Sequence, residues 1–238
     1  MALKLYTVHN SHPCAAVERA LQRKGLAYSV IEWPPTLHPL FQRAFFGART
    51  VPALRSGSEK IVGSRAIMHW LDDFQPEPRL YPDDPDERAR VEDADVWGDE
   101  RLQQVARDLI WVGLRHRPDA LVSYGRDAQL ATPAAVVRLA APAIARAGAR
   151  LNRTDDAKAR RRMQELPAQL DKIDAWIADG TIGDARHPNA ADLQILSTIR
   201  ILSSFTDVQP MLADRPSLAA AQRLWPPVVG TLPAGSLP

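Results

Sequence analysis

The first 76 residues alternate short apolar runs with amphipathic stretches. Four runs have the length and residue types of strands, namely Leu3–Val8, Tyr28–Glu32, Val51–Arg55 and Lys60–Val62. Two stretches repeat their apolar residues at helical spacing, Pro13–Lys24 and Ser64–Phe74. Strands that alternate with helices predict an α/β layer fold for this part of the chain. The stretch from Pro34 to Arg49 is predicted to be a loop, with polar groups at His38, Gln42 and Arg49.

The pattern changes after a proline-rich break at residues 75–78. Apolar residues then recur at helical spacing over 91–112 and 163–177, where Pro167 predicts a kink or a later helix start. Asn189 and Asp192 have the spacing of a helix cap, and residues 193–205 are apolar on most faces, which predicts a central buried helix. We therefore expect four segments: an α/β domain (1–76), a linker (77–85), an all-helical domain (86–225) and an extended tail rich in proline and glycine (226–238).

Composition narrows the class of protein. The chain has 238 residues, 45% of them hydrophobic and 24% charged, with a formal net charge of only +2, so we expect no nucleic-acid partner. The basic run at 158–162 is predicted to be a solvated helix face. A single cysteine permits no internal disulfide. With no visible signal peptide and no apolar run long enough to cross a bilayer, we expect a cytoplasmic protein without a membrane partner.

The first turn of the chain is the first place to look for chemistry. Ser11, His12, Pro13 and Cys14 lie between the first predicted strand and the first predicted helix. Unpaired N–H groups and the positive end of the helix dipole stabilise an anion there. Three other interpretations remain open: Cys14 as a small buried hydrophobe, Ser11 as a helix cap, and a metal site formed by His9, His12 and Cys14. The last lacks a fourth ligand, so we expect no metal.

Two further motifs fit this turn. Val51 and Pro52 begin a strand, and a cis bond there would leave the Val51 backbone groups free to pair with an extended ligand. Gly63, Ser64 and Arg65 form a strand-to-helix turn, where free N–H groups and a hydroxyl can bind a carboxylate. The simpler interpretations are a strand-edge proline and an ordinary helix cap.

These motifs, in this order and spacing, resemble the thioredoxin-like domain of cytosolic glutathione transferases. The helical part, with its capped buried helix, resembles the second domain of that family, so the resemblance covers residues 1 to about 225. It implies an α/β thioredoxin-like domain followed by an all-α domain. It also implies glutathione as co-substrate, a small electrophile as second substrate, and a homodimer.

The resemblance also assigns expected roles. Ser11 falls where serine-type members hold the glutathione thiolate, and Cys14 is the alternative as a resolving-type cysteine. Pro13, Val51 and Pro52 would contact the tripeptide, Ser64 would hold its γ-glutamyl carboxylate, and Arg65 would add charge or face solvent. Gly63 replaces the usual acid or amide. Three functions follow: a glutathione transferase, a Cys14-dependent thiol transferase, and a non-catalytic binding or scaffold protein of the same fold.

Overall fold

A four-stranded mixed sheet forms the core of the first part of the chain. The computed structural model describes residues 2–34, 37–129 and 132–238. The strands are β1 (Leu3–Thr7), β2 (Tyr28–Glu32), β3 (Ala53–Ser56) and β4 (Glu59–Val62). Their order is β2-β1-β3-β4, with β1 parallel to β2 and antiparallel to β3, and β3 antiparallel to β4. This arrangement confirms the α/β fold expected for the first part.

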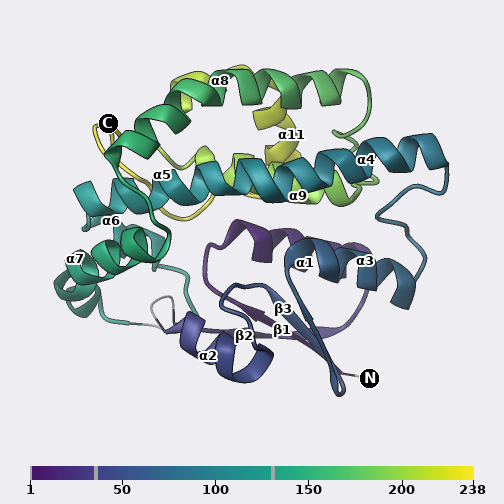
Figure 1. The fold of residues 1–238 in the computed structure, drawn as a ribbon, viewed down its shortest axis with the longest axis horizontal. Helices are drawn as coiled ribbons and strands as arrows, with labels where there is room; N and C mark the ends of the chain where they lie inside the picture. Colours follow the sequence, from purple (N-terminus) through teal and green to yellow (C-terminus); the bar gives the residue numbers. More distant parts are fainter. Residues whose placement is uncertain (1, 35–36, 130–131) are drawn as a thin grey trace.

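Helices cover both faces of this sheet (Figure 1). One face carries α1 (His12–Arg23) and α3 (Ser64–Phe74), which bury an apolar stripe that includes Val17, Leu21 and Leu71. The other face carries α2 (His38–Phe46), which lies within the stretch predicted to be a loop. That prediction was wrong because Pro34 and His38-Pro39 read as loop signals, whereas a proline in the first turn of a helix loses no hydrogen bond.

The described chain from Pro85 to Leu224 is mostly helical, and the tail that follows contains no helix, as expected. Figure 1 shows the long run α4–α5 and the antiparallel α8 stacked above α9, which separates them from α1 and α3. The bounds are α4 (Pro85–Trp97), η1 (Gly98–Leu102), α5 (Gln103–His116), α6 (Ala120–Tyr124), α7 (Ala134–Leu151), α8 (Asp156–Ala178), α9 (Ala190–Leu202), α10 (Gln209–Leu212) and α11 (Pro216–Leu224). Among the described residues, no helix combines the length and apolar character that a membrane span needs.

The centre of this helical part is α9, as its apolar sequence predicted. Asn189 accepts a hydrogen bond from the Asp192 amide at 2.9 Å, and Asp192 accepts one from the Asn189 amide at 3.0 Å, which is a complete capping box. Twelve of the thirteen residues of α9 are buried. The helix packs against α1 on one side and α4 and α11 on the other, so it joins the two parts of the molecule.

Two expectations about α8 can be compared with the structure. The helix runs from Asp156 to Ala178 with Pro167 inside it, so the later start at Pro167 is wrong, and the kink stays a prediction. The basic run is only partly solvated: Lys158 and Arg162 form ion pairs at 2.8 and 3.0 Å with Asp108, whose side chain is 1% exposed. The pattern of charges could not reveal a carboxylate buried under that face.

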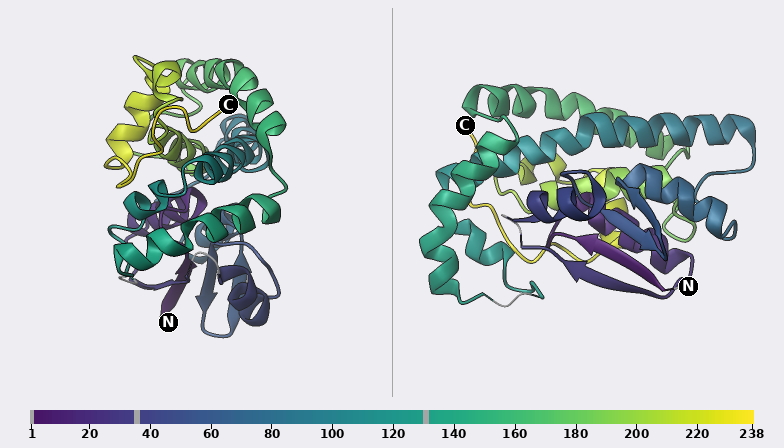
Figure 2. Two further views of the ribbon diagram at one scale, coloured as in Figure 1. Left: turned by 90° about the vertical axis from the view of Figure 1, so that its left-hand side faces the viewer. Right: turned by 60° about the horizontal axis from the view of Figure 1, so that its bottom comes forward.

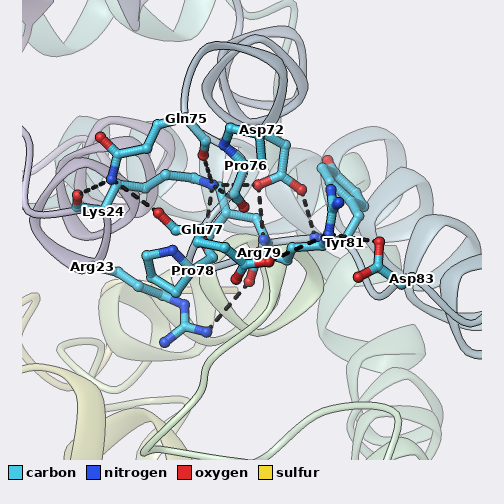
Figure 3. A network of polar contacts seen from close by, with 11 residues as sticks. Arg23, Lys24, Asp72, Gln75, Pro76, Glu77, Pro78, Arg79, Tyr81 and Asp83 are labelled. Carbon is cyan, nitrogen blue, oxygen red and sulfur yellow. Dashed lines mark hydrogen bonds and ion pairs between the residues drawn. The ribbon is translucent and has the colours of Figure 1, made fainter.

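The segment between α3 and α4 is held to the first part by a buried lysine (Figure 3). The Lys24 ammonium donates to Asp72 Oδ1 at 2.6 Å and to the carbonyls of Gln75 and Pro78 at 2.7 and 2.9 Å. Asp72 in turn accepts hydrogen bonds from the backbone amides of Leu80 and Tyr81, both at 2.9 Å. The network orders this segment on the surface of α1 and α3. The domain and linker bounds themselves stay a prediction.

Candidate functional site

Three turns meet at one end of the sheet. The pairing of Tyr6 with Ala53 places the end of β1 beside the start of β3, so the turn before α1 lies next to Val51 and Pro52. The amide of Gly63 donates to the Pro52 carbonyl at 2.9 Å, which brings the start of α3 to the same end. The three motifs singled out in the sequence therefore lie at the same end of the sheet. The helices α1 and α3, which begin there, contact α9 of the helical part.

Ser11 is the residue that begins α1. Its backbone is extended, its carbonyl accepts from the Ala15 amide at 3.0 Å, and its side chain makes no cap to the helix. Ser11 is therefore a partly exposed residue at the positive end of the helix, and its side chain hydrogen-bonds Cys14 instead of capping the helix. Pro13 follows in the first turn, where its missing N–H costs nothing. Asn10, with φ of 58°, donates from Nδ2 to the Tyr124 carbonyl at 2.8 Å and holds the turn.

Cys14 points inward from the same turn. Its side chain is buried, with 4% exposed, and burial raises the pKa of its thiol to about 12, although hydrogen bonds from the Ser11 side chain and the Val8 backbone lower it. A thiol held this way is almost entirely protonated at neutral pH and is poorly nucleophilic. Of the two rival residues, Ser11 thus presents the accessible group and Cys14 lies behind it.

Arg107 of α5 places a partly buried positive charge near the turn before α1. His12 Nδ1 lies 3.0 Å from Thr198 Oγ1, and burial together with the charge of Arg107 lowers the pKa of His12 to about 3, so its ring is neutral. The Arg107 guanidinium donates to Gln103 Oε1 at 3.3 Å. Burial lowers the Arg107 pKa while Asp99 and Asp108 raise it, yet within the described residues no carboxylate lies at ion-pair distance from it. It is a partly buried cation without a paired anion.

The Val51–Pro52 peptide bond is cis. Within the described part of the chain, neither the N–H nor the C=O of Val51 takes part in a hydrogen bond, so both are available to an extended ligand. Gln42 of α2 is fully buried and its Nε2 donates to the Thr50 carbonyl at 3.0 Å, which fixes the residue before Val51. Gln42 thus holds the segment before Val51 in place. Its position in a stretch predicted to be a loop did not suggest this role.

Ser64 begins α3 and turns its hydroxyl toward α9. Its side chain is buried, and the Gln194 Nε2 donates to Ser64 Oγ at 3.1 Å and to Asp99 Oδ1 at 3.1 Å. Burial raises the pKa of Asp99. The preceding Gly63 has φ of 96°, a conformation that favours glycine. The hydroxyl that the sequence singled out is therefore oriented by a residue 130 positions away.

Arg65 lies on the far side of that helix start. Its Nε is 3.2 Å from Asp95 Oδ2, an oxygen that also accepts from the Tyr81 hydroxyl at 2.8 Å. Burial raises the pKa of Asp95 to about 6, against the lowering effects of Tyr81 and Arg65. The arginine thus joins α3 to α4. Within the described residues, no group of three or more histidine, cysteine or acidic side chains is placed to hold a metal ion.

Sequence reasoning missed three polar residues of this region: Asp99, Arg107 and Gln194. All three come from the helical part and are brought to the sheet by packing. A signal existed for Gln194, because an amide within the apolar run of a buried helix must find a partner. Asp99 lies in η1, a π-helical turn, and such turns within α-helices often occur at functional sites.

Part of the chain is similar in sequence to known proteins. Residues 5–79 match a family model described as glutathione S-transferase, N-terminal domain. The chain is 33% identical over 92 residues to a maleylpyruvate isomerase from a Ralstonia species, a match that covers 37% of this chain and 43% of that protein. The chain thus spans less than half the length of this curated relative.

Solved structures resemble the chain over most of its length. The beta-etherase LigF from a Sphingobium strain superposes with a TM-score of 0.68 at 18% identity, covering 93% of both chains. A glutathione S-transferase from Methylobacterium radiotolerans, in complex with glutathione sulfonate, has a TM-score of 0.61 at 19% identity and covers 94% of this chain and 90% of that one. At such identities these likenesses show the fold.

Proposed function

The chain belongs to the glutathione S-transferase family through its N-terminal domain, and we propose that it is a glutathione-dependent enzyme acting on a small electrophile. One observation carries the proposal. Three groups lie around one end of the sheet. They are the hydroxyl of the partly exposed Ser11, the unpaired backbone of Val51 and the Ser64 hydroxyl that Gln194 orients. These are the groups needed to hold a thiol, an extended peptide backbone and a carboxylate.

In this proposal Ser11 stabilises the glutathione thiolate. A free thiol has a pKa near 8.5, so only a few per cent is thiolate at neutral pH. The Ser11 hydroxyl, which hydrogen-bonds the Cys14 side chain in the free protein, would turn to donate to the glutathione sulfur at the N-terminus of α1, and the neutral His12 beside it adds no positive charge. The Val51 N–H and C=O pair with the cysteinyl unit of glutathione. Ser64, held by Gln194, binds the γ-glutamyl carboxylate with the free N–H groups of α3.

Arg107 favours an electrophile that carries a carboxylate. A partly buried guanidinium without a paired anion beside the reacting turn is best satisfied by an anionic substrate. The thiolate would add to an electrophilic carbon of that substrate. If the adduct is protonated the product is a conjugate, whereas expulsion of the thiolate after rotation about a carbon–carbon bond gives an isomer and returns the glutathione. The matching relative's name, an isomerase, favours testing both outcomes.

Two alternatives remain as proposals of lower support. Thiol transfer through Cys14 requires a thiolate, which burial disfavours at this position. A scaffold without catalysis needs no unpaired polar groups near the turn before α1. The Val51 backbone and the Arg107 side chain nevertheless offer such groups.

The experiment compares Ser11→Ala with Cys14→Ala. We expect both variants to bind glutathione in calorimetry. Ser11→Ala should lower kcat by about 10²–10³-fold, because a hydrogen-bond donor to the developing anion is lost. Cys14→Ala should keep kcat within about threefold. Equal activity of Ser11→Ala and wild type would refute the assigned role, and a folded wild-type protein that binds no glutathione would refute the proposed function.

The substrate class is tested with Arg107→Gln. Its KM should rise by tenfold or more for an unsaturated dicarboxylate and by less for a neutral electrophile such as chlorodinitrobenzene. Titration of the remaining thiol separates conjugation, which consumes glutathione, from isomerisation, which does not. An equal change in KM for both substrates would refute the role of Arg107.

A further inference from the structure

A polar hollow lies where α5, α7 and the start of α8 meet, and its lining residues are distant in sequence from the three turns of the candidate site. It has a volume of about 560 Å³, and its lining residues are Arg115, Arg146, Ala149, Arg150, Arg153, Thr154 and Asp155. Figures 1 and 2 show α7 at the end of the molecule where the chain turns back into α8. Four arginines from two helices and the connecting turn therefore surround one space with a single lining carboxylate.

The charges of these arginines are largely uncompensated. Only Arg115 has an acidic partner among the described residues, since its Nη2 pairs with Asp156. Arg146, Arg150 and Arg153 form no ion pair there, although the described chain contains many carboxylates that do. Residues 128–154 contain four arginines and no acidic residue, in a chain whose formal net charge is only +2. This segment thus carries a local formal charge of +4, which exceeds the net charge of the whole chain.

The carboxylates nearest the hollow are already occupied. The Asp155 side chain accepts a hydrogen bond from the Lys158 amide at 2.8 Å and caps α8, so it holds the helix end itself. Asp156 is shared between Arg115 and His116, whose Nε2 lies 2.8 Å from it, and these contacts lower the Asp156 pKa. Among the described residues, neither acid forms an ion pair with Arg146, Arg150 or Arg153.

We propose that this hollow, the α7–α8 arginine pocket, binds a small molecule that carries adjacent phosphate groups. Guanidinium forks match phosphate oxygens in pairs, and several of them around one hollow match an anion with several oxygens. Ala149 is the one apolar lining residue, and no aromatic side chain is present to stack on a base or a ring. Recognition therefore rests on the phosphates, and the rest of the ligand projects into solvent.

The test uses inorganic pyrophosphate and the full-length protein at physiological ionic strength. Calorimetry should detect binding to wild type, and the double variant Arg146→Gln/Arg150→Gln should weaken it about tenfold or more. Arg138→Gln is the matched control, because Arg138 is exposed on the same helix and does not line the hollow. It should change the affinity by less than twofold.

Other results would overturn the proposal. The pocket is refuted if wild type binds no pyrophosphate, if the double variant binds as well as wild type, or if Arg138→Gln loses as much affinity. Binding of citrate as tight as that of pyrophosphate would refute the phosphate class. Sedimentation with phosphatidic acid vesicles but no binding of free pyrophosphate would refute a small-molecule ligand. The unfolding midpoint of each variant checks that lost binding is not lost folding.

Discussion

Replacement of Lys24 by methionine should destabilise the protein strongly. The Lys24 side chain is 0% exposed and that of Asp72 is 7% exposed, so their ion pair is screened little by solvent. Methionine keeps the length of the side chain but removes the charge and the donors. Asp72 is then left as a buried carboxylate with two backbone donors, and two carbonyls that accepted at 2.7 and 2.9 Å lose their partner.

The expected cost follows from that arrangement. Removing one partner of a buried ion pair typically costs about 3–5 kcal/mol, because the other charge stays buried without compensation. We therefore expect the free energy of unfolding in urea to fall by about 3–5 kcal/mol in Lys24→Met. The control is Lys4→Met, which removes an exposed lysine from β1 and should stay within about 0.5 kcal/mol of wild type. A loss below about 1 kcal/mol in Lys24→Met would show that the buried network around Lys24 and Asp72 contributes little to stability.

Three further predictions follow from buried groups. Gln194→Leu removes the donor that orients Ser64, so the Kd for glutathione measured by calorimetry should rise about tenfold, and an unchanged Kd would contradict that role. Burial raises the folded-state pKa of Asp95 to about 6, so the stability it contributes is fully present only below its unfolded-state pKa of about 4 and is lost as the pH rises through about 6. Wild type should lose about 2 kcal/mol relative to Asp95→Asn between pH 4 and pH 6 in urea titrations, and parallel pH profiles would refute the shift. Cys14, with a pKa near 12, should react with an aromatic disulfide at pH 8 at least 100-fold more slowly than free cysteine, and a comparable rate would contradict its burial.

Local signals in the sequence were sufficient for most elements. The capping pair Asn189 and Asp192 and the apolar run after it identify the central helix without knowledge of the fold. The strand limits were found within one or two residues because each run is bounded by turn residues. The helix from His38 to Phe46 was missed, since its prolines and mixed polarity read as a loop when its buried face is unknown.

The site was predictable only as far as its residues are close in sequence. The turns at Ser11, Val51 and Ser64 are local motifs, and the sheet register brings them together. The partners that orient them are not local: Gln194 reaches Ser64 from 130 residues away. The same holds for Lys24, whose partners lie 48 to 54 residues ahead and make an ordinary helix-end lysine a buried one.

In the proposed function, Ser11 at the start of α1 holds the glutathione thiolate. The most direct measurement is the ultraviolet absorbance of the thiolate of bound glutathione, titrated against pH for wild type and Ser11→Ala. We expect the thiol pKa of glutathione bound to wild type to lie at least one unit below the free value near 8.5. In Ser11→Ala this pKa should return toward the free value. Equal thiol pKa values in the two proteins, or a return that occurs in Cys14→Ala instead, would contradict it.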